Sequence, residues 1–242
     1  MSKTIFRFYS GLVKMLLSRG YNSTAQRHLI QTVLEDDCQG FCDCLDQMDT
    51  NYEIANFRSK GPLNNFEKLI GVWKKSDLRA RKQLDYKILL YFANVPDDTS
   101  SVNKQETVLA YSYLAHFVGV KTLYFLHINP ISTTSLSQLT NPKIAPNNFI
   151  IRVISAASFE IDISANIYIP EHTLITDVEA FYAREKYSKG SLPKINADDP
   201  AIINLGGSPG QIVKIVRSEL FNGGFKTLYF REITSSSHPV RC

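Results

Sequence analysis

The sequence contains no hydrophobic run that approaches the roughly 20 residues a bilayer span requires. It also lacks the pattern of a secretory signal, because Arg7 and Lys14 are spread through an amphipathic stretch and do not precede an apolar block. We therefore expect neither a membrane span nor secretion. With 242 residues, 44% hydrophobic and 21% charged, the composition is typical of an ordinary soluble protein with one large or two modest domains.

Cysteine is scarce, and its spacing does not form a zinc pattern. Cys38, Cys42 and Cys44 lie close together, whereas Cys242 is far from them in the sequence. A zinc knuckle usually needs two pairs of Cys or His at a spacing of about two to four residues, and no second pair is found nearby. We therefore expect reduced thiols in a reducing compartment, with no metal and no cofactor.

Catalytic and phosphate-binding motifs are also missing. No G-x-x-x-x-G-K-[ST] occurs, and no G-x-G-x-x-G opens a helix. Residues 206–210 fit the G-x-S-x-G nucleophile elbow by letter, but Ser208 is followed by Pro209, which has no amide for an oxyanion hole. We predict a turn there and a structural, hydrogen-bonded role for His172. No residue is predicted to be catalytic.

One enzyme class stays open as an alternative. Asp97 and Asp98 follow a predicted strand, and clustered carboxylates are what a two-metal nuclease uses to hold its ions. Such a site also needs a further acid and a Lys on the adjoining strand, which offers Lys121 but no acid. A loop is the favoured interpretation, and a metal-dependent nuclease on the N-terminal α/β core is the alternative.

The net charge of +4 is modest, but the charges are distributed unevenly. Residues 58–87 carry nine Lys or Arg against three acids, whereas residues 35–53 carry seven acids and no base. A basic stretch of this size can bind phosphates, since each neutralised phosphate releases condensed counterions. A solvated helix face explains the same composition equally well.

The first two thirds of the sequence predict an α/β domain over residues 1–164. An amphipathic helix is expected at 4–19, ended by Gly20, and a further helix at 24–48. Residues 51–65 are expected to connect it to a short apolar piece at 66–73. A strand at 86–93, a helix at 103–117 and a strand at 120–127 favour a parallel pair with a right-handed crossover. Two more strands are expected at 149–154 and 159–163.

Residues 165–242 predict a small mixed α/β domain. Thr176 and Glu179 fit a capping box that starts one helix, which we expect to end before Gly190. Asp199 is expected to cap a second helix with Pro200 in its first position. Glycines then turn the chain into a hairpin whose strands are 211–217 and 225–233, joined at Gly223-Gly224.

The order of motifs in this region resembles one known family. Pro170-Glu171-His172 is followed by a helix, Leu192-Pro193-Lys194-Ile195, Asp199-Pro200, the stretch 210–217 and a strand ending in an aromatic-Arg pair. This order resembles the assembly domain of the fifth subunit shared by eukaryotic nuclear RNA polymerases, and it is similar to the archaeal counterpart of that subunit. Residues 15–21 also resemble the end of the first helix in the eukaryotic proteins.

The resemblance implies a non-catalytic structural subunit of a DNA-directed RNA polymerase. Its C-terminal assembly domain is expected to dock on the largest subunit. Its N-terminal jaw domain is expected to lie beside downstream duplex DNA and to contact the sugar-phosphate backbone of the DNA without reading its sequence. The expected location is the nucleus, or the cytoplasm or virion if a large DNA virus encodes the protein.

Two sets of site residues follow from this interpretation. The expected subunit interface comprises Leu192, Pro193, Ile195, Pro200, Gly210, Lys214, Arg217 and Arg231. The expected DNA-proximal residues are the hydroxyls of Thr133, Thr134 and Ser135, in a loop at 129–135, and a second, basic group of Lys74, Lys75, Arg79 and Arg81.

Overall fold

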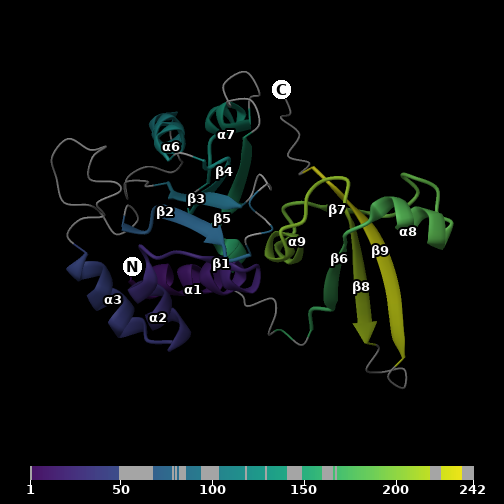
Figure 1. The fold of residues 1–242 in the computed structure, drawn as a ribbon, viewed down its shortest axis with the longest axis horizontal. Helices are drawn as coiled ribbons and strands as arrows, with labels where there is room; N and C mark the ends of the chain where they lie inside the picture. The colour runs from purple at the N-terminus through teal and green to yellow at the C-terminus, as the bar shows by residue number, and fades with distance from the viewer. Residues whose placement is uncertain are drawn as a thin grey trace. The chain divides into compact units, whose positions relative to one another are not determined.

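The computed structural model describes residues 2–48, 68–77, 79, 81, 86–93, 104–117, 119–128, 130–140, 149–159, 166, 168–218 and 225–235. The chain divides into two compact units, Met1–Glu160 and Ile161–Cys242, which we call unit 1 and unit 2. Both mix helices with a sheet (Figure 1), so the predicted α/β fold class is confirmed.

The centre of unit 1 is a five-stranded sheet in the order β1-β2-β3-β4-β5. The strands are β1 (Tyr21–Asn22), β2 (Gly71–Lys75), β3 (Lys87–Phe92), β4 (Thr122–His127) and β5 (Ile150–Ser155). Strands β3, β4 and β5 run parallel, and β1 and β2 continue the sheet antiparallel. The predicted parallel pair, β3 and β4 with α6 (Lys104–His116) between them in sequence, is confirmed.

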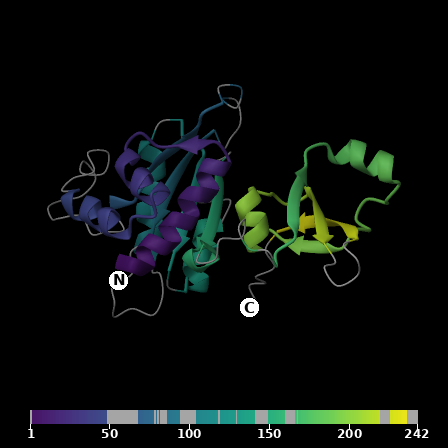
Figure 2. The same cartoon turned by 90° about the horizontal axis from the view of Figure 1, so that it is seen from below.

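Helices cover both faces of this sheet. Helix α1 (Ser2–Ser18) lies on one face, while α6 and α7 (Thr133–Thr140) lie on the other (Figures 1 and 2). The rings of Phe8 and Tyr9 on α1 reach Phe92 of β3, with centroids 5.8 and 6.4 Å apart. Because both faces are covered, β3 and β4 are nearly continuous apolar runs, as is typical of buried parallel strands.

Two predictions for unit 1 need correction. The stretch 24–48 forms two helices, α2 (Arg27–Leu34) and α3 (Cys38–Gln47), because Asp36 adopts a left-handed conformation and Asp37 then caps α3. The Asp37 carboxylate accepts the Gly40 amide at 2.8 Å. The strand expected at 159–163 begins at a residue that ends a 3-10 helix, η2 (Ala156–Phe159), and its remainder lies outside the described residues, as do residues 51–65.

Unit 2 is built on a four-stranded sheet in the order β6-β8-β9-β7. Its strands are β6 (Glu171–Ile175), β7 (Lys194–Asn196), β8 (Ile212–Ser218) and β9 (Lys226–Thr234). The antiparallel pairing of β8 with β9 confirms the predicted hairpin, whose turn residues 223–224 lie outside the described residues. The sequence patterns did not indicate β6 or β7.

Two short helices, α8 (Val178–Glu185) and α9 (Pro200–Leu205), complete unit 2. The predicted cap of α9 is confirmed, since the Asp199 carboxylate accepts the Ala201 amide at 2.9 Å. The predicted capping box of α8 is wrong. Its N-cap is Asp177, whose carboxylate is one residue closer to the helix and accepts the Ala180 amide at 2.9 Å. Helix α8 ends at Glu185, followed by the left-handed C-cap Lys186, and so ends before Gly190 as predicted.

The sheet of unit 2 has a small core on each face. Around α9 the buried residues are Ile202, Val213, Ile215 and Ile233. Around α8 they are Phe181, Leu192 and Ile212. Gly207 lies against the first core, where an added Cβ would come within 2.6 Å of Ile233 Cδ1. The turn after α9 therefore packs directly on the sheet and fixes where β8 begins.

Candidate functional site

Three predicted interface cations lie on the β8–β9 hairpin. The Arg217 guanidinium lies 5.0 Å from the ring centroid of Tyr229, its diagonal neighbour on β9. Arg231 donates from Nη1 to the backbone oxygen of Lys194 at 3.3 Å. Lys214 is partly buried in the middle of β8. The hairpin thus presents Lys214 on one face and Arg217 and Arg231 on the other.

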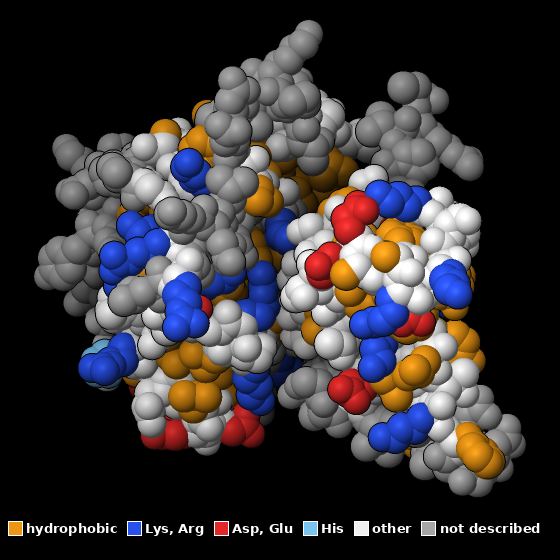
Figure 3. All heavy atoms as spheres, turned by 45° about the vertical axis from the view of Figure 1, so that its right-hand side comes forward, with side chains coloured by type: hydrophobic (Ala, Val, Ile, Leu, Met, Phe, Trp, Pro, Cys, Tyr) orange, Lys and Arg blue, Asp and Glu red, His pale blue; other side chains and the backbone are white. Residues whose placement is uncertain are grey.

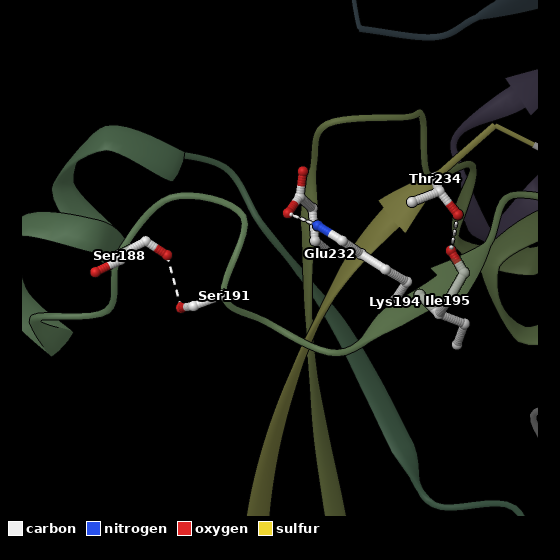
Figure 4. A network of polar contacts seen from close by, with 6 residues as sticks. All are labelled: Ser188, Ser191, Lys194, Ile195, Glu232 and Thr234. Atoms are coloured by element: carbon white, nitrogen blue, oxygen red, sulfur yellow. Dashed lines mark hydrogen bonds and ion pairs between the residues drawn. The ribbon is translucent and has the colours of Figure 1, made fainter.

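The predicted segment 192–195 is held to β9 by several polar contacts (Figure 4). The Lys194 ammonium forms an ion pair with the Glu232 carboxylate. The backbone amide of Glu232 donates to the backbone oxygen of Pro193 at 2.9 Å. The Thr234 hydroxyl donates to the backbone oxygen of Ile195 at 3.3 Å. Upstream of this segment, the Ser191 hydroxyl donates to the backbone oxygen of Ser188 at 2.7 Å. The segment enters the sheet as β7.

The other predicted interface residues divide between core and surface. Leu192 is buried beside Phe181, and Ile195 packs against the α9 core, so these side chains stabilise unit 2 itself. Pro193, Pro200 and Gly210 are exposed. Gly210 has a φ of 85°, which favours glycine in the turn before β8.

Sequence reasoning missed a group of exposed apolar side chains at the start of β9. Phe225 is 75%, Leu228 51% and Tyr229 39% exposed. On the face of unit 2 shown in Figure 3, hydrophobic side chains lie among Lys and Arg side chains. The sequence of β9 contained a usable signal: successive side chains of a strand point to opposite faces, and the consecutive Leu228 and Tyr229 therefore put an apolar side chain on each face.

The first DNA-proximal set lies on a helix and not in the predicted loop. Thr133 and Thr134 are exposed in the first turn of α7. Ser135 is buried, and its amide donates to the Ser132 hydroxyl at 3.1 Å, while that hydroxyl donates to the Ser135 oxygen at 2.8 Å. The missed signal was Ser132, which satisfies the free amide of a helix start. Of the three predicted hydroxyls, two face solvent.

The second DNA-proximal set lies at the opposite end of the sheet. Lys74 and Lys75 end β2, where Lys74 pairs directly with Lys87 at the start of β3. The first set follows the far end of β4, a strand that runs parallel to β3. A six-residue strand is about 20 Å long, so the structure does not bring the two sets together. Arg79 and Arg81 follow Lys75 and are exposed.

Further cations gather at this end of the sheet, on the face covered by α1. Arg19 donates from Nη1 to the Tyr124 hydroxyl at 2.8 Å. Its guanidinium also lies 5.4 Å from the Tyr21 ring centroid, over which the Lys75 ammonium lies at 5.5 Å. The Arg152 guanidinium is 6.0 Å from the Tyr124 centroid. Lys74 and Lys87 lie at the same end, but strand alternation makes their side chains project from the opposite face. We call the five cations at this end of the sheet the basic end; they are Arg19, Lys74, Lys75, Lys87 and Arg152.

Sequence reasoning found only part of the basic end. Lys74, Lys75 and Lys87 fall within the basic stretch, whereas Arg19 and Arg152 are far away in the sequence and isolated among neutral residues. The fold brings them together because Arg19 follows the last turn of α1 and Arg152 pairs with Tyr124 across β5 and β4. No pattern of neighbouring residues in the sequence predicts that Arg19 and Arg152 join this group.

Ser208 and His172, which resemble catalytic residues in the sequence, have structural roles in the fold. Ser208 lies in a turn, as predicted, after helix α9 and before strand β8, the reverse of a nucleophile elbow. His172 Nδ1 lies 2.6 Å from the backbone oxygen of Pro170, in keeping with the predicted structural role. Asp97 and Asp98 lie outside the described residues.

Metal-ligating side chains do not cluster in the described parts of the chain: no three of His, Cys, Asp and Glu come together there. Cys38, Cys42 and Cys44 are partly buried thiols on α3, and Cys242 lies outside the described residues. Among the helices that the structure describes, none is both long and apolar enough to cross a membrane.

Comparison with known proteins gives one consistent result. Residues 161–231 match the family described as RNA polymerase Rpb5, C-terminal domain. The chain is 39% identical over 70 residues to the DNA-directed RNA polymerase subunit Rpo5 of Nitrosopumilus maritimus, covering 28% of this chain and 82% of that protein. For Rpo5 of Pyrococcus abyssi the identity is 34% over 80 residues, covering 32% of this chain and 95% of the relative.

A viral protein is similar as well. The DNA-directed RNA polymerase RPB5 homolog of African swine fever virus is 36% identical over 84 residues, which cover 34% of this chain and 41% of the viral protein. The two archaeal matches span most of each relative's own length but only 28% and 32% of this chain. The similarity to the archaeal proteins therefore covers about a third of this chain.

Proposed function

The chain belongs to the Rpb5 family of DNA-directed RNA polymerase subunits, and we propose that it serves as a structural subunit whose unit 2 docks on the largest subunit while unit 1 lines the downstream DNA channel. A subunit of this family contributes no catalytic residue of its own. The alternative of a free-standing nuclease has no support from the comparisons.

The observation that carries the docking proposal is that residues 161–231 match the Rpb5 C-terminal domain, while the part of this chain similar to the archaeal subunits spans most of their length. The matched region covers 82% and 95% of two proteins that are polymerase subunits by name. A module that makes up nearly a whole subunit must contain what that subunit needs to join its polymerase. We therefore assign the largest-subunit interface of this chain to unit 2.

The surface of unit 2 supports this assignment. Exposed apolar side chains accompany cations on both faces of the hairpin: Leu228 shares a face with Lys214, and Tyr229 shares the other with Arg217 and Arg231. Stable interfaces typically combine apolar with polar surface in this way. Pro193, Pro200 and Gly210 are exposed, and the two proline rings fix φ, so docking through the prolines would cost little conformational entropy.

The test is purification of the tagged full-length chain from its own cells, followed by mass spectrometry and sedimentation. We expect it to co-purify with the largest subunit and further polymerase subunits in constant proportion, and to sediment with them. A chain that sediments at its own mass, with no large companion, would contradict the proposal.

For unit 1 we propose that the basic end meets the backbone of the downstream duplex. Lys74 and Lys87 are directly opposite each other on neighbouring strands, an arrangement that destabilises a sheet. A polyanion beside them relieves this repulsion and releases counterions. Thr133 and Thr134, at the other end of the sheet, form a second candidate contact, through hydroxyls that bind phosphate without reading sequence.

We expect the double substitution Lys74→Glu and Lys87→Glu to weaken binding of the assembled polymerase to downstream duplex. Each lost phosphate contact reduces the slope of log K against log salt by about 0.9, so the pair should reduce it by about 2. The measurement is DNA affinity at several salt concentrations. The matched variant, Thr133→Ala with Thr134→Ala, removes no charge and should leave the slope unchanged. An unaltered slope for the Lys variant would remove the basic end from the proposal.

We propose that the protein is located where its polymerase works. The motifs that resemble the shared subunit of nuclear polymerases favour the nucleus, and the similarity to a viral subunit favours the cytoplasm or virion as the second candidate. Imaging of the chain together with the largest subunit separates the two.

A further inference from the structure

Strand β9 has a neighbour on only one side for much of its length. It pairs with β8 from Lys226 to Glu232, but β7 pairs only with residues 232–234 on its other side. Residues 226–231 therefore form an open edge as far as the described part of the chain extends. We call this stretch the β9 edge.

The hydrogen bonds that β9 makes show which of its backbone groups face the open side. The Ile233 amide donates to Gln211, in the direction of β8, at 2.8 Å, whereas the Glu232 amide donates to Pro193, in the direction of β7, at 2.9 Å. Backbone groups alternate between the two sides along a strand. The amides and carbonyls of Lys226, Leu228 and Phe230 thus point to the open side.

The β9 edge lacks most of the devices that keep an edge strand from pairing. Proteins usually protect such edges with short strands, prolines, bulges or charged side chains. Strand β9 spans nine residues without a proline, and among residues 226–231 only Lys226 and Arg231 are charged. Its exposed side chains include Leu228 and Tyr229, with Phe225 just before it. An edge of this kind is suited to receiving another strand.

The outer edge of β6, the other open edge of the sheet, is less suited. Strand β6 is five residues long, and its exposed residues are the polar Glu171 and Thr173. Among its partly buried residues, His172 is hydrogen-bonded to Pro170. The β9 edge is therefore the better place for an added strand.

Charge indicates what kind of segment would bind there. Strands β8 and β9 carry four cations and one acid, and that acid, Glu232, is paired with Lys194 of β7. Complementary charge on a partner steers association and fixes register. The cations that remain to attract a partner are Lys214, Arg217, Lys226 and Arg231.

We propose that the β9 edge receives an extended, acidic segment of the polymerase's largest subunit, which adds a strand to the sheet of unit 2. Backbone hydrogen bonds to Lys226 and Leu228 supply affinity, and side chains on alternate positions supply specificity, as in other cases of strand addition. An apolar side chain of the segment lies against Leu228, and its acids face Lys226 and Arg231. This inference rests on the proposed function, since it names how the proposed interface is built.

The test compares two substitutions at one position in the tagged full-length chain. Leu228→Pro removes the outward amide, while Leu228→Ala keeps it and removes the same apolar contact. Proline is tolerated at an edge when the lost amide faces outward, so the hairpin bonds to β8 should persist. We expect the Pro variant to lose at least about tenfold in co-purified polymerase and the Ala variant only a few-fold, because hydrogen bonds between chains add to side-chain packing.

Amide hydrogen exchange on the unsubstituted chain gives a second readout that needs no variant to fold. In the free chain the amides of Lys226 and Leu228 should exchange quickly, and in the purified polymerase they should be protected at least about tenfold, as strand hydrogen bonds protect amides. Equal exchange in both states, or full incorporation of the Pro variant, would overturn the strand addition. If the unsubstituted chain captures no polymerase at all, the proposed function fails instead, and the two failures are thus distinguishable.

Discussion

Substitution of Gln26 by Ala should lower the free energy of unfolding of unit 1 by about 3 kcal/mol, because it leaves two buried donors without an acceptor. The Gln26 side-chain oxygen accepts from the Tyr9 hydroxyl at 3.0 Å and from Trp73 Nε1 at 3.0 Å. Its amide nitrogen donates to the backbone oxygen of Leu69 at 2.7 Å. One side chain thus joins helix α1, strand β2 and the turn before β2.

Burial makes this network costly to break. Tyr9, Gln26 and Trp73 are all buried, and desolvation raises the pKa of the Tyr9 phenol well above its ordinary value, so its hydroxyl stays protonated and available as a donor. A buried donor without a partner costs about 1–3 kcal/mol. The matched control is Gln31→Ala, since Gln31 is exposed and its side-chain amide donates to Glu35, the C-cap residue of α2. It should change stability by less than about 0.5 kcal/mol.

The measurement is urea unfolding followed by tryptophan fluorescence. Trp73 is the only tryptophan and is buried in unit 1, so its emission reports that unit without interference from unit 2. A Gln26→Ala midpoint equal to that of the control would contradict the predicted role of the network.

A second substitution at the same position adds a pH dependence with a definite sign. In Gln26→Glu the introduced carboxyl is buried, so its folded-state pKa should be raised above the unfolded value of about 4.3. When protonated, it can still donate to Leu69. Stability should therefore approach that of the original chain below about pH 4.3 and fall as pH rises through the raised pKa, whereas the original chain lacks this loss.

The parts of the fold that the sequence predicted well are those with strong local signals. Strands β3 and β4 are continuous apolar runs, and helix α9 begins with an Asp cap followed by Pro200. Strand β6 was missed because its alternation is short and its exposed positions hold Glu and Thr. The three-residue strand β7 forms because it pairs with β9. Its partner residues are 38 positions later in the sequence, so the local pattern of β7 could not predict it.

The same distinction holds for the site residues. The hairpin cations Lys214 and Arg217 lie within a predicted strand, and a local pattern is enough to place them there. Leu192 was proposed as an interface residue, but the packing of Phe181 and Ile212 around it places it in the core. The Gln26 network and the full basic end could not be predicted from the sequence for one reason. Each brings together residues from strands and helices that are far apart in the sequence.

Substitution of Gly11 by Ala should destabilise unit 1 by about 2 kcal/mol, opposite in sign to what helix propensity predicts. Within a helix, Ala is favoured over Gly by about 1 kcal/mol. Gly11 lies in the middle of α1, however, and an added Cβ would come within 2.4 Å of the backbone oxygen of Phe159 and 3.1 Å of its Cβ. Overpacking of this kind typically costs about 1–3 kcal/mol.

An added Cβ at Gly11 would meet a backbone carbonyl, whereas an added Cβ at Gly207 would meet side chains. An added Cβ at Gly207 meets the methyl groups of Ile233 and Ile202, which can move by side-chain rotation, whereas the carbonyl of Phe159 moves only if η2 or α1 shifts. The control within α1 is Lys14→Ala, at an exposed position, which should leave the urea midpoint of Trp73 fluorescence nearly unchanged. A Gly11→Ala chain more stable than the original would show that α1 does not pack on η2 as closely as the structure indicates.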